Sequence, residues 1–147
     1  MSISGVNLYL VLWRAARAAQ SYDHSSIEGL GLNVTDFAVL ECLLHKGPLP
    51  ISAIGARVLL TSGSMTAAVD RLETQKLVER RSDPDDRRSR IVHLTAAGKR
   101  LIVKAFRQHE AAVDSLFSEF SAEERRRLYK ALREIGRRAE ALQAAEH

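Results

Sequence analysis

The chain has few of the residues that build covalent cross-links or membrane spans. It contains one cysteine, Cys42, among 147 residues, which excludes an internal disulfide and is typical of a protein in a reducing compartment. Its longest apolar run, from Leu8 to Trp13, is far shorter than the roughly 20 residues that cross a bilayer. No basic stretch precedes this run, and Arg14 and Arg17 follow it. We therefore expect a cytoplasmic protein without an export signal or a membrane partner.

Sequence patterns of catalysis are missing as well. We find no glycine-rich phosphate loop, nucleophile elbow or paired acid motif, so we expect no enzyme. Only His45 lies near Cys42, and the other histidines are scattered, so we expect neither a metal site nor a cofactor. The net charge of +4 is mild, and the positions of the basic residues therefore matter more than their sum.

The alternation of polar and apolar residues predicts a mainly α-helical fold with one small β-hairpin. Helical periodicity covers residues 5–27, 35–46, 51–58, 61–76, 96–120 and 121–144, and strand character appears at 76–82 and 90–94. Hydroxyl residues that suit helix N-caps precede several helices, namely Thr35, Thr61, Thr95 and Ser121. The fourth helical stretch is the centre of this organisation.

The helix from Thr61 to Lys76 has two different faces. Its inward stripe is predicted from the spacing of four residues: Met65, Val69, Leu72 and Lys76. The other face carries small or polar side chains and one arginine: Ser62, Gly63, Ser64, Thr66, Ala67 and Arg71. A slim polar cylinder fits a major groove about 12 Å wide, although an ordinary amphipathic surface helix would share this pattern. With the short helix at 51–58 before it, the stretch matches a helix-turn-helix.

The hairpin that follows has a basic tip. Asp83 to Asp86 has turn chemistry, and Arg87, Arg88 and Arg90 cluster beside it. Arginines at a hairpin tip suit a minor groove, where the negative potential favours them. The alternative is a solvated hairpin, which we favour less because only Asp85 and Asp86 are available as acidic partners at the tip.

The two ends of the chain carry more apolar surface than one copy needs. Residues 8–13 are apolar on every side of a helix, and the last helix has a heptad seam formed by Leu128, Leu132, Ile135, Ala139 and Leu142. The natural cover is a second copy of the chain. We therefore divide it into an N-terminal dimerisation helix (1–34), a winged helix-turn-helix unit (35–95) and C-terminal dimerisation helices (96–147).

Three stretches together resemble the MarR (multiple-antibiotic-resistance regulator) family of winged helix-turn-helix transcription factors. They are residues 59–64 together with 69–73, residues 77–80, and Asp86-Arg87-Arg88 leading to Leu94-Thr95-Ala96-Ala97-Gly98. The resemblance implies a homodimer that is held by the first, fifth and sixth helices and binds a near-palindromic double-stranded DNA operator. It also implies that Arg88 enters the minor groove, that Asp86 holds the wing, and that the outward residues after Thr61 face the major groove.

The resemblance further implies a ligand pocket where the first, second and fifth helices meet the reading unit. The candidate residues are Tyr9, Trp13, Arg17, His24, Phe37, Phe106 and His109. Residues 35–40, 46–48 and 59–64 resemble the subgroup that responds to quinones and phenols. The leading hypothesis is thus a dimeric repressor released by a small aromatic ligand.

Two alternatives remain open on the same scaffold. Cys42 could act as the thiol of an oxidant-sensing repressor, although a small buried residue is the simpler interpretation. The chain could also be a winged-helix module that binds protein instead of DNA.

Overall fold

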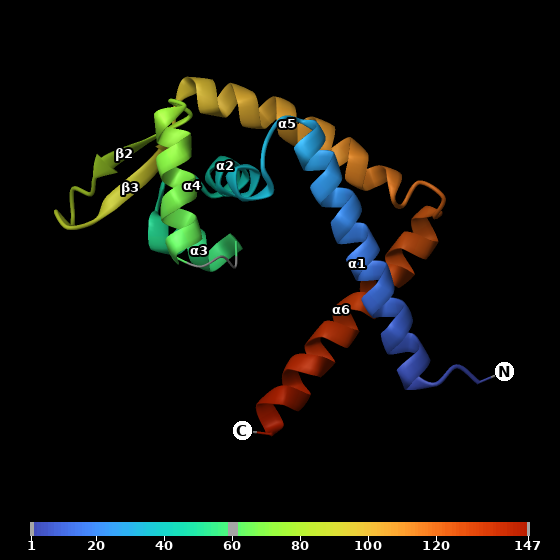
Figure 1. Ribbon diagram of the computed structural model, residues 1–147. Coiled ribbons are helices and arrows are strands. Elements are labelled where there is room, and N and C mark those ends of the chain that lie inside the picture. The colour runs from blue at the N-terminus through green and yellow to red at the C-terminus, as the bar shows by residue number, and fades with distance from the viewer. Residues whose placement is uncertain (1, 59–61, 147) are drawn as a thin grey trace. The chain divides into compact units, whose positions relative to one another are not determined.

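Helices make up most of the computed structural model, which describes residues 2–58 and 62–146 (Figure 1). Within these residues the order is α1 (Gly5–Gly29), α2 (Val34–Lys46), β1 (Leu49–Pro50), α3 (Ile51–Val58), α4 (Ser62–Thr74), β2 (Val78–Ser82), β3 (Arg90–Leu94), α5 (Ala96–Ser115) and α6 (Ala122–Ala145). The predicted mainly α fold with a small hairpin is confirmed. The chain divides into two compact units, Met1–Ala112 and Val113–His147, which we describe separately.

The core of the first unit lies where α2, α3 and α4 meet the small sheet. Phe37, Leu40, Ile54, Met65 and Leu72 are among its fully buried side chains. On α4, the predicted inward positions Met65, Val69 and Leu72 are all buried, and Ala68 joins them. Burial of a large aliphatic or aromatic side chain contributes about 1.5–3 kcal/mol, so this stripe fixes which face of α4 is left outside.

The fourth predicted position of that stripe, Lys76, is wrong. The helix ends at Thr74, and Lys76 has a left-handed backbone with φ of 60°. Its N–H donates to the carbonyl of Glu73 (2.9 Å), and the next N–H, that of Leu77, donates to Leu72 (2.9 Å). Such bonds close a helix C-terminus and turn the chain into β2, which leaves the Lys76 side chain exposed.

The sheet has the strand order β1-β3-β2, and both pairings are antiparallel. Val92 lies opposite Arg80 on β2 and opposite Leu49 on β1, and its side chain is fully buried. Figure 1 shows the β2–β3 hairpin beside α4, with α3 at the other end of that helix. This is the arrangement of a helix-turn-helix with a wing.

Three helix starts show how local capping sets the boundaries. The N-cap of α2 is Asn33, whose Oδ1 accepts the N–H of Asp36 at 2.7 Å, so the predicted cap Thr35 is wrong by two residues. Thr95 caps α5 as predicted, since its hydroxyl accepts the N–H of Gly98 at 3.0 Å. Ser121 and Glu124 form a reciprocal capping box on α6. The predicted cap Thr61 lies outside the described residues.

Gly98 brings α5 against the end of α4. A Cβ at this position would lie 1.9 Å from the carbonyl oxygen of Leu77, so only glycine fits. The same carbonyl accepts the N–H of Thr95 at 3.0 Å, and the Thr95 hydroxyl donates to the carbonyl of Lys76 at 2.7 Å. The start of α5 is thereby fixed to the base of the wing. Its end comes earlier than predicted, at Ser115 instead of near Phe120.

Both terminal helices expose apolar side chains in a single copy. On α1 the exposed residues include Val6, Leu8, Tyr9, Leu10, Val11 and Trp13. On α6 the seam positions Leu132, Ile135 and Leu142 are 43–53% exposed, and no residue of this helix is buried. Of the helices described, none is both long enough and apolar enough to cross a membrane.

Candidate DNA-binding surface

The outward face of α4 is formed by small and polar residues. Gly63, Ser64 and Thr66 are exposed, on the opposite side of the helix from buried Met65, Ala68 and Val69. Ser62 begins the helix, but its side chain lies outside the described part of the chain. The hydroxyls of Ser64 and Thr66 cannot form the bidentate contact by which an arginine reads guanine. Sequence recognition by this face would therefore depend on phosphate contacts, water and DNA shape.

Arg71, the remaining predicted residue of this face, is bound to another helix. Its Nη2 donates to Oδ1 of Asp36 at 2.7 Å, and its Nε lies 3.5 Å from Oδ2. The side chain of Asp36 is 8% exposed, whereas that of Arg71 is 44% exposed. The hydrogen bond to Asp36 raises the pKa of Arg71 above its ordinary value. The guanidinium of Arg71 thus links α4 to the first turn of α2.

A second arginine, Arg80, ties α4 to the wing. Its guanidinium contacts Asp70 at 2.5 Å and Glu73 at 2.9 Å, and its backbone N–H donates to Glu73 at 3.0 Å. Burial alone would lower the pKa of Arg80, but the hydrogen bonds to Asp70 and Glu73 outweigh it and raise the pKa. Asp70 and Glu73 therefore join β2 to α4 through Arg80.

The tip of the wing is shaped by aspartate side chains. Oδ1 of Asp86 accepts the N–H of Arg88 at 3.0 Å, and Oδ1 of Asp83 accepts the N–H of Asp85 at 2.9 Å. The N–H of Asp83 donates to the carbonyl of Ser89 across the turn at 3.2 Å. The carboxylate of Asp86 therefore binds the backbone of Arg88, the residue whose side chain is predicted to enter the minor groove.

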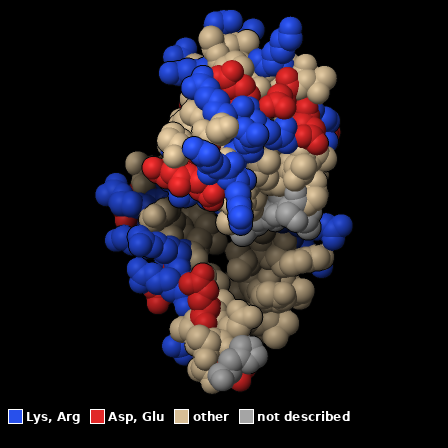
Figure 2. All heavy atoms as spheres, turned by 90° about the vertical axis from the view of Figure 1, so that its left-hand side faces the viewer, with Lys and Arg blue, Asp and Glu red and all other residues tan. Residues whose placement is uncertain are grey.

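The arginines of the tip differ in their contacts. Arg90 donates to the hydroxyl of Ser82 at 2.5 Å. Arg87 and Arg88 are exposed, and neither has a carboxylate within ion-pair distance among the described residues. In Figure 2 Lys and Arg side chains stand out from the part of this face that the hairpin forms, with acidic residues between them. The two unpaired guanidinium groups are therefore available to phosphates.

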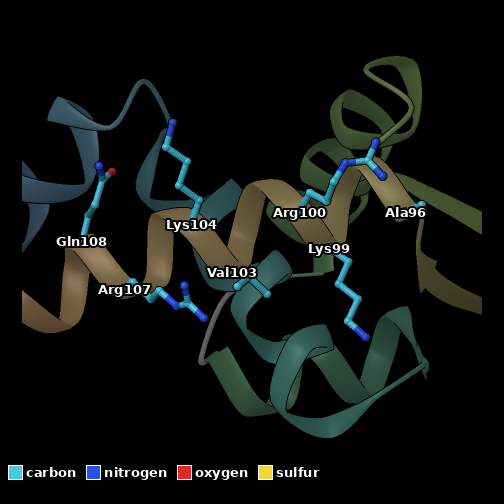
Figure 3. Close-up of a pocket in the computed structure, with 7 residues that line it drawn as sticks. All are labelled: Ala96, Lys99, Arg100, Val103, Lys104, Arg107 and Gln108. Atoms are coloured by element: carbon cyan, nitrogen blue, oxygen red, sulfur yellow. The ribbon is translucent and has the colours of Figure 1, made fainter.

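A second basic surface runs along α5. Lys99, Arg100, Lys104 and Arg107 line a shallow hollow together with Ala96, Val103 and Gln108. Figure 3 shows that their head groups diverge from the helix in different directions and do not point at a common centre. This geometry suits a solvated helix face better than a site for one small anion.

Part of the predicted ligand site is brought together between α1, α2 and α5. The ring centroid of His109 lies 4.9 Å from that of Phe37 and 6.1 Å from that of Phe106, and Phe106 lies 4.7 Å from His45. Nδ1 of His109 is 3.3 Å from Oδ1 of Asp23, yet neither atom has an aligned hydrogen-bond partner and both are buried. We call these five residues the ring cluster.

The other predicted ligand residues do not join the recorded contacts of the ring cluster. Tyr9 and Trp13 are exposed on the N-terminal half of α1, and the guanidinium of Arg17 lies 5.5 Å from the Trp13 ring. His24 is partly buried. Sequence reasoning did not place Asp23 and His45 at this site, because each reaches its partner there only through contacts between helices.

Cys42 is buried, with 8% of its surface exposed. Burial raises the pKa of its thiol, and Glu41 adds to this, while Arg57 and Lys46 oppose it. A protonated, covered thiol reacts slowly with oxidants, so the structure does not favour the oxidant-sensing hypothesis. Within the described residues no group of three His, Cys, Asp or Glu side chains could hold a metal ion.

Comparison with known proteins identifies the fold and the family. Residues 32–89 match the MarR family model, and the chain is 39% identical over 136 residues to the HTH-type transcriptional regulator MhqR of Bacillus subtilis, covering 92% of this chain and 94% of that protein. This chain belongs to the MarR family. It is therefore a DNA-binding transcriptional regulator with a winged helix-turn-helix.

Solved structures of MarR-type regulators have the same fold. The regulator BldR of Sulfolobus solfataricus is 27% identical with a TM-score of 0.72, and covers 90% of this chain and 94% of its own. BpsR of Bordetella bronchiseptica, whose DNA binding is regulated by 6-hydroxynicotinic acid, is 24% identical with a TM-score of 0.73, covering 88% and 98%. At that identity the likeness to BpsR shows the fold alone.

Proposed function

We propose that this MarR-family chain is a homodimeric repressor that binds a near-palindromic operator and is released by a small aromatic ligand. One observation carries the DNA-binding part. Two arginines without a carboxylate partner, Arg87 and Arg88, occur in the same unit as the exposed polar face of α4. Both elements belong to one unit in which Arg80 joins them. The reading face would enter the major groove, and Arg88 the adjacent minor groove.

Dimer formation is supported by the apolar surface of the terminal helices. The exposed side chains of α1 and the seam of α6 would remain in water in an isolated copy, which costs about 25 cal/mol for each Å² left exposed. A two-fold dimer also presents two copies of α4, which is what half-sites one helical turn apart require.

The ring cluster supports the choice of an aromatic ligand. A phenol or quinone that enters between these tilted and edge-on rings would replace existing ring contacts with new ones, so little packing would be lost on binding. Its oxygen would meet Nδ1 of His109 and Oδ1 of Asp23, two buried atoms that have no aligned partner. Burial without a hydrogen bond costs such atoms about 1–3 kcal/mol, and a phenolic hydroxyl would recover part of it.

One experiment tests the proposal in full. DNA bound by the wild-type chain is selected from a random duplex pool, with and without phenol and benzoquinone derivatives, and the complexes are sized by analytical ultracentrifugation. We expect recovered sites with two related half-sites about 10 base pairs apart, bound by two chains. Recovery of no preferred sequence would contradict operator binding. If no aromatic compound changes the amount of bound DNA that is recovered, the proposed release mechanism is contradicted.

A further inference from the structure

The pair formed by Asp36 and Arg71 joins two segments 35 residues apart. Asp36 lies in the first turn of α2, where its backbone N–H is held by Asn33, and Arg71 lies in the last turn of α4. Two guanidinium nitrogens face the two carboxylate oxygens at 2.7 and 3.5 Å. A paired geometry of this kind restricts direction as well as distance, because the guanidinium and carboxylate groups are both planar.

Burial makes the pair more than a surface contact. Asp36 is 5% exposed and is the one buried charged residue among those that the structure describes. A carboxylate removed from water needs a partner, and Arg71 is the cation that supplies it. Loss of either partner therefore changes the packing of α4 on α2, and not only the net charge.

We infer that Arg71 is a positioning residue, which holds the reading helix at its angle to α2 through Asp36, and that it is not a DNA contact. This inference rests on the proposed operator binding. It revises the initial interpretation of the outward face, in which Arg71 was a direct contact. Among the described side chains, the reading face then consists of Gly63, Ser64 and Thr66, and the C-terminal turn of α4 is its support.

The two roles of Arg71 predict opposite effects at Asp36. If Arg71 contacted phosphate, Asp36→Asn would free the guanidinium from its carboxylate, and DNA affinity would stay the same or rise. If Arg71 positions α4, the same change weakens DNA binding although it removes a negative charge. Asp36→Asn is therefore the decisive variant, since general electrostatics predicts the wrong sign for it.

The test measures binding to a labelled duplex of about 30 base pairs, recovered by the wild-type chain from a random pool, over a series of salt concentrations. We expect Asp36→Asn and Arg71→Gln each to weaken binding about tenfold, and the double variant to be no weaker than either single one. The salt slope of all three stays at the wild-type value, because no phosphate contact is lost. Arg107→Gln, which removes the same charge from the outer face of α5, is the matched control and retains wild-type affinity.

Two results would overturn the inference. One is an Asp36→Asn chain that binds as tightly as wild type or more tightly. The other is an Arg71→Gln chain in which the magnitude of the salt slope decreases by about 0.9, the change expected when one phosphate contact is lost. If either variant fails to fold, Asp36→Glu and Arg71→Lys keep both charges while altering the paired geometry, and the positioning role predicts weaker binding with an unchanged slope for them also.

A measurement without DNA separates this inference from the proposed function. Amide hydrogen exchange of the free chain should accelerate in the last turns of α4 and the first turn of α2 in both single variants, and remain unchanged in Arg107→Gln. Failure of the wild-type chain to select any DNA would refute operator binding and leave this exchange result standing. Unchanged exchange in α4 in the Asp36 and Arg71 variants would refute the positioning role, whether or not DNA binds.

Discussion

The contact between Gly98 and Leu77 allows a prediction in which two effects of one methyl group oppose each other. In Gly98→Ala the added Cβ would meet the Leu77 carbonyl oxygen at 1.9 Å and its carbon at 2.8 Å. The two segments must separate by roughly 1.5 Å to reach an ordinary contact. Leu77 has little freedom to move, because its N–H and its carbonyl are both hydrogen-bonded, to Leu72 and Thr95.

The magnitude follows from the balance of these terms. Overpacking against backbone costs about 3 kcal/mol, at the upper end of the usual range, while alanine gains about 1 kcal/mol over glycine within a helix. The net loss is about 2 kcal/mol, which lowers the melting temperature of a 147-residue chain by roughly 6 °C. Alanine thus destabilises the chain here, against its helix propensity.

The assay is urea-induced unfolding followed by circular dichroism at one fixed protomer concentration, since association would otherwise shift the midpoint. Gly29→Ala is the control. Gly29 lies in the last turn of α1, and a Cβ at this position would meet no atom within 4 Å. The control should be as stable as wild type or slightly more stable. A Gly98→Ala chain that matches the control would refute the reasoning, and would mean that the α5 start and the wing base separate at little cost.

Three further predictions concern the wing, the thiol and the start of α6. Arg88→Ala should weaken operator binding several-fold and lower the salt slope by about one, and an unchanged slope in a fluorescence-anisotropy titration would remove Arg88 from the interface. Because burial raises the pKa of Cys42, its stabilising contribution is complete below the unfolded-state pKa and is lost as pH rises through the native pKa. Iodoacetamide should therefore label Cys42 far more slowly in the native chain than in urea, and equal rates would contradict this. Hydrogen bonds from the hydroxyl and backbone N–H of Ser121 lower the pKa of Glu124, so the capping box stabilises α6 above the unfolded-state pKa of Glu124 and is lost as pH falls through the native value. In Ser121→Ala, NMR titration of the carboxyl group should show a higher pKa for Glu124 than in wild type. An unchanged pKa would contradict the role of the Ser121 hydroxyl in the capping box.

The elements that sequence predicted well are those set by neighbours along the chain. The inward stripe of α4 at Met65, Val69 and Leu72 follows from helical spacing, and the caps at Thr95 and Ser121 follow from one hydroxyl placed before a helix. The α2 cap was wrong because Asn33 and Thr35 both suit the position, and only the backbone decides between them. Lys76 was wrong because a helical pattern does not reveal a left-handed residue that ends the helix.

The contacts that sequence could not give are those between distant charges. Asp36 has several cations that could pair with it, and nothing in the order of residues selects Arg71. The same holds for Asp23 and His45, which reach the rings of His109 and Phe106 only after α1, α2 and α5 have packed. The division into residues 1–34, 35–95 and 96–147 and the roles of the DNA-facing residues stay predictions, which the binding experiments above address.

The three-way contact of Arg80 limits how such a regulator can let go of its operator. Since the Arg80 guanidinium contacts Asp70 and Glu73 while its backbone belongs to β2, these contacts oppose movement of the hairpin independently of α4. Under the proposed binding mode, a signal that tilts α4 out of the major groove also moves the wing arginines away from the minor groove. We then expect release in a single step without a half-bound form. A gradual rise in the concentration of the proposed ligand would lower the fraction of operators that are occupied, and would not weaken the binding at each occupied operator.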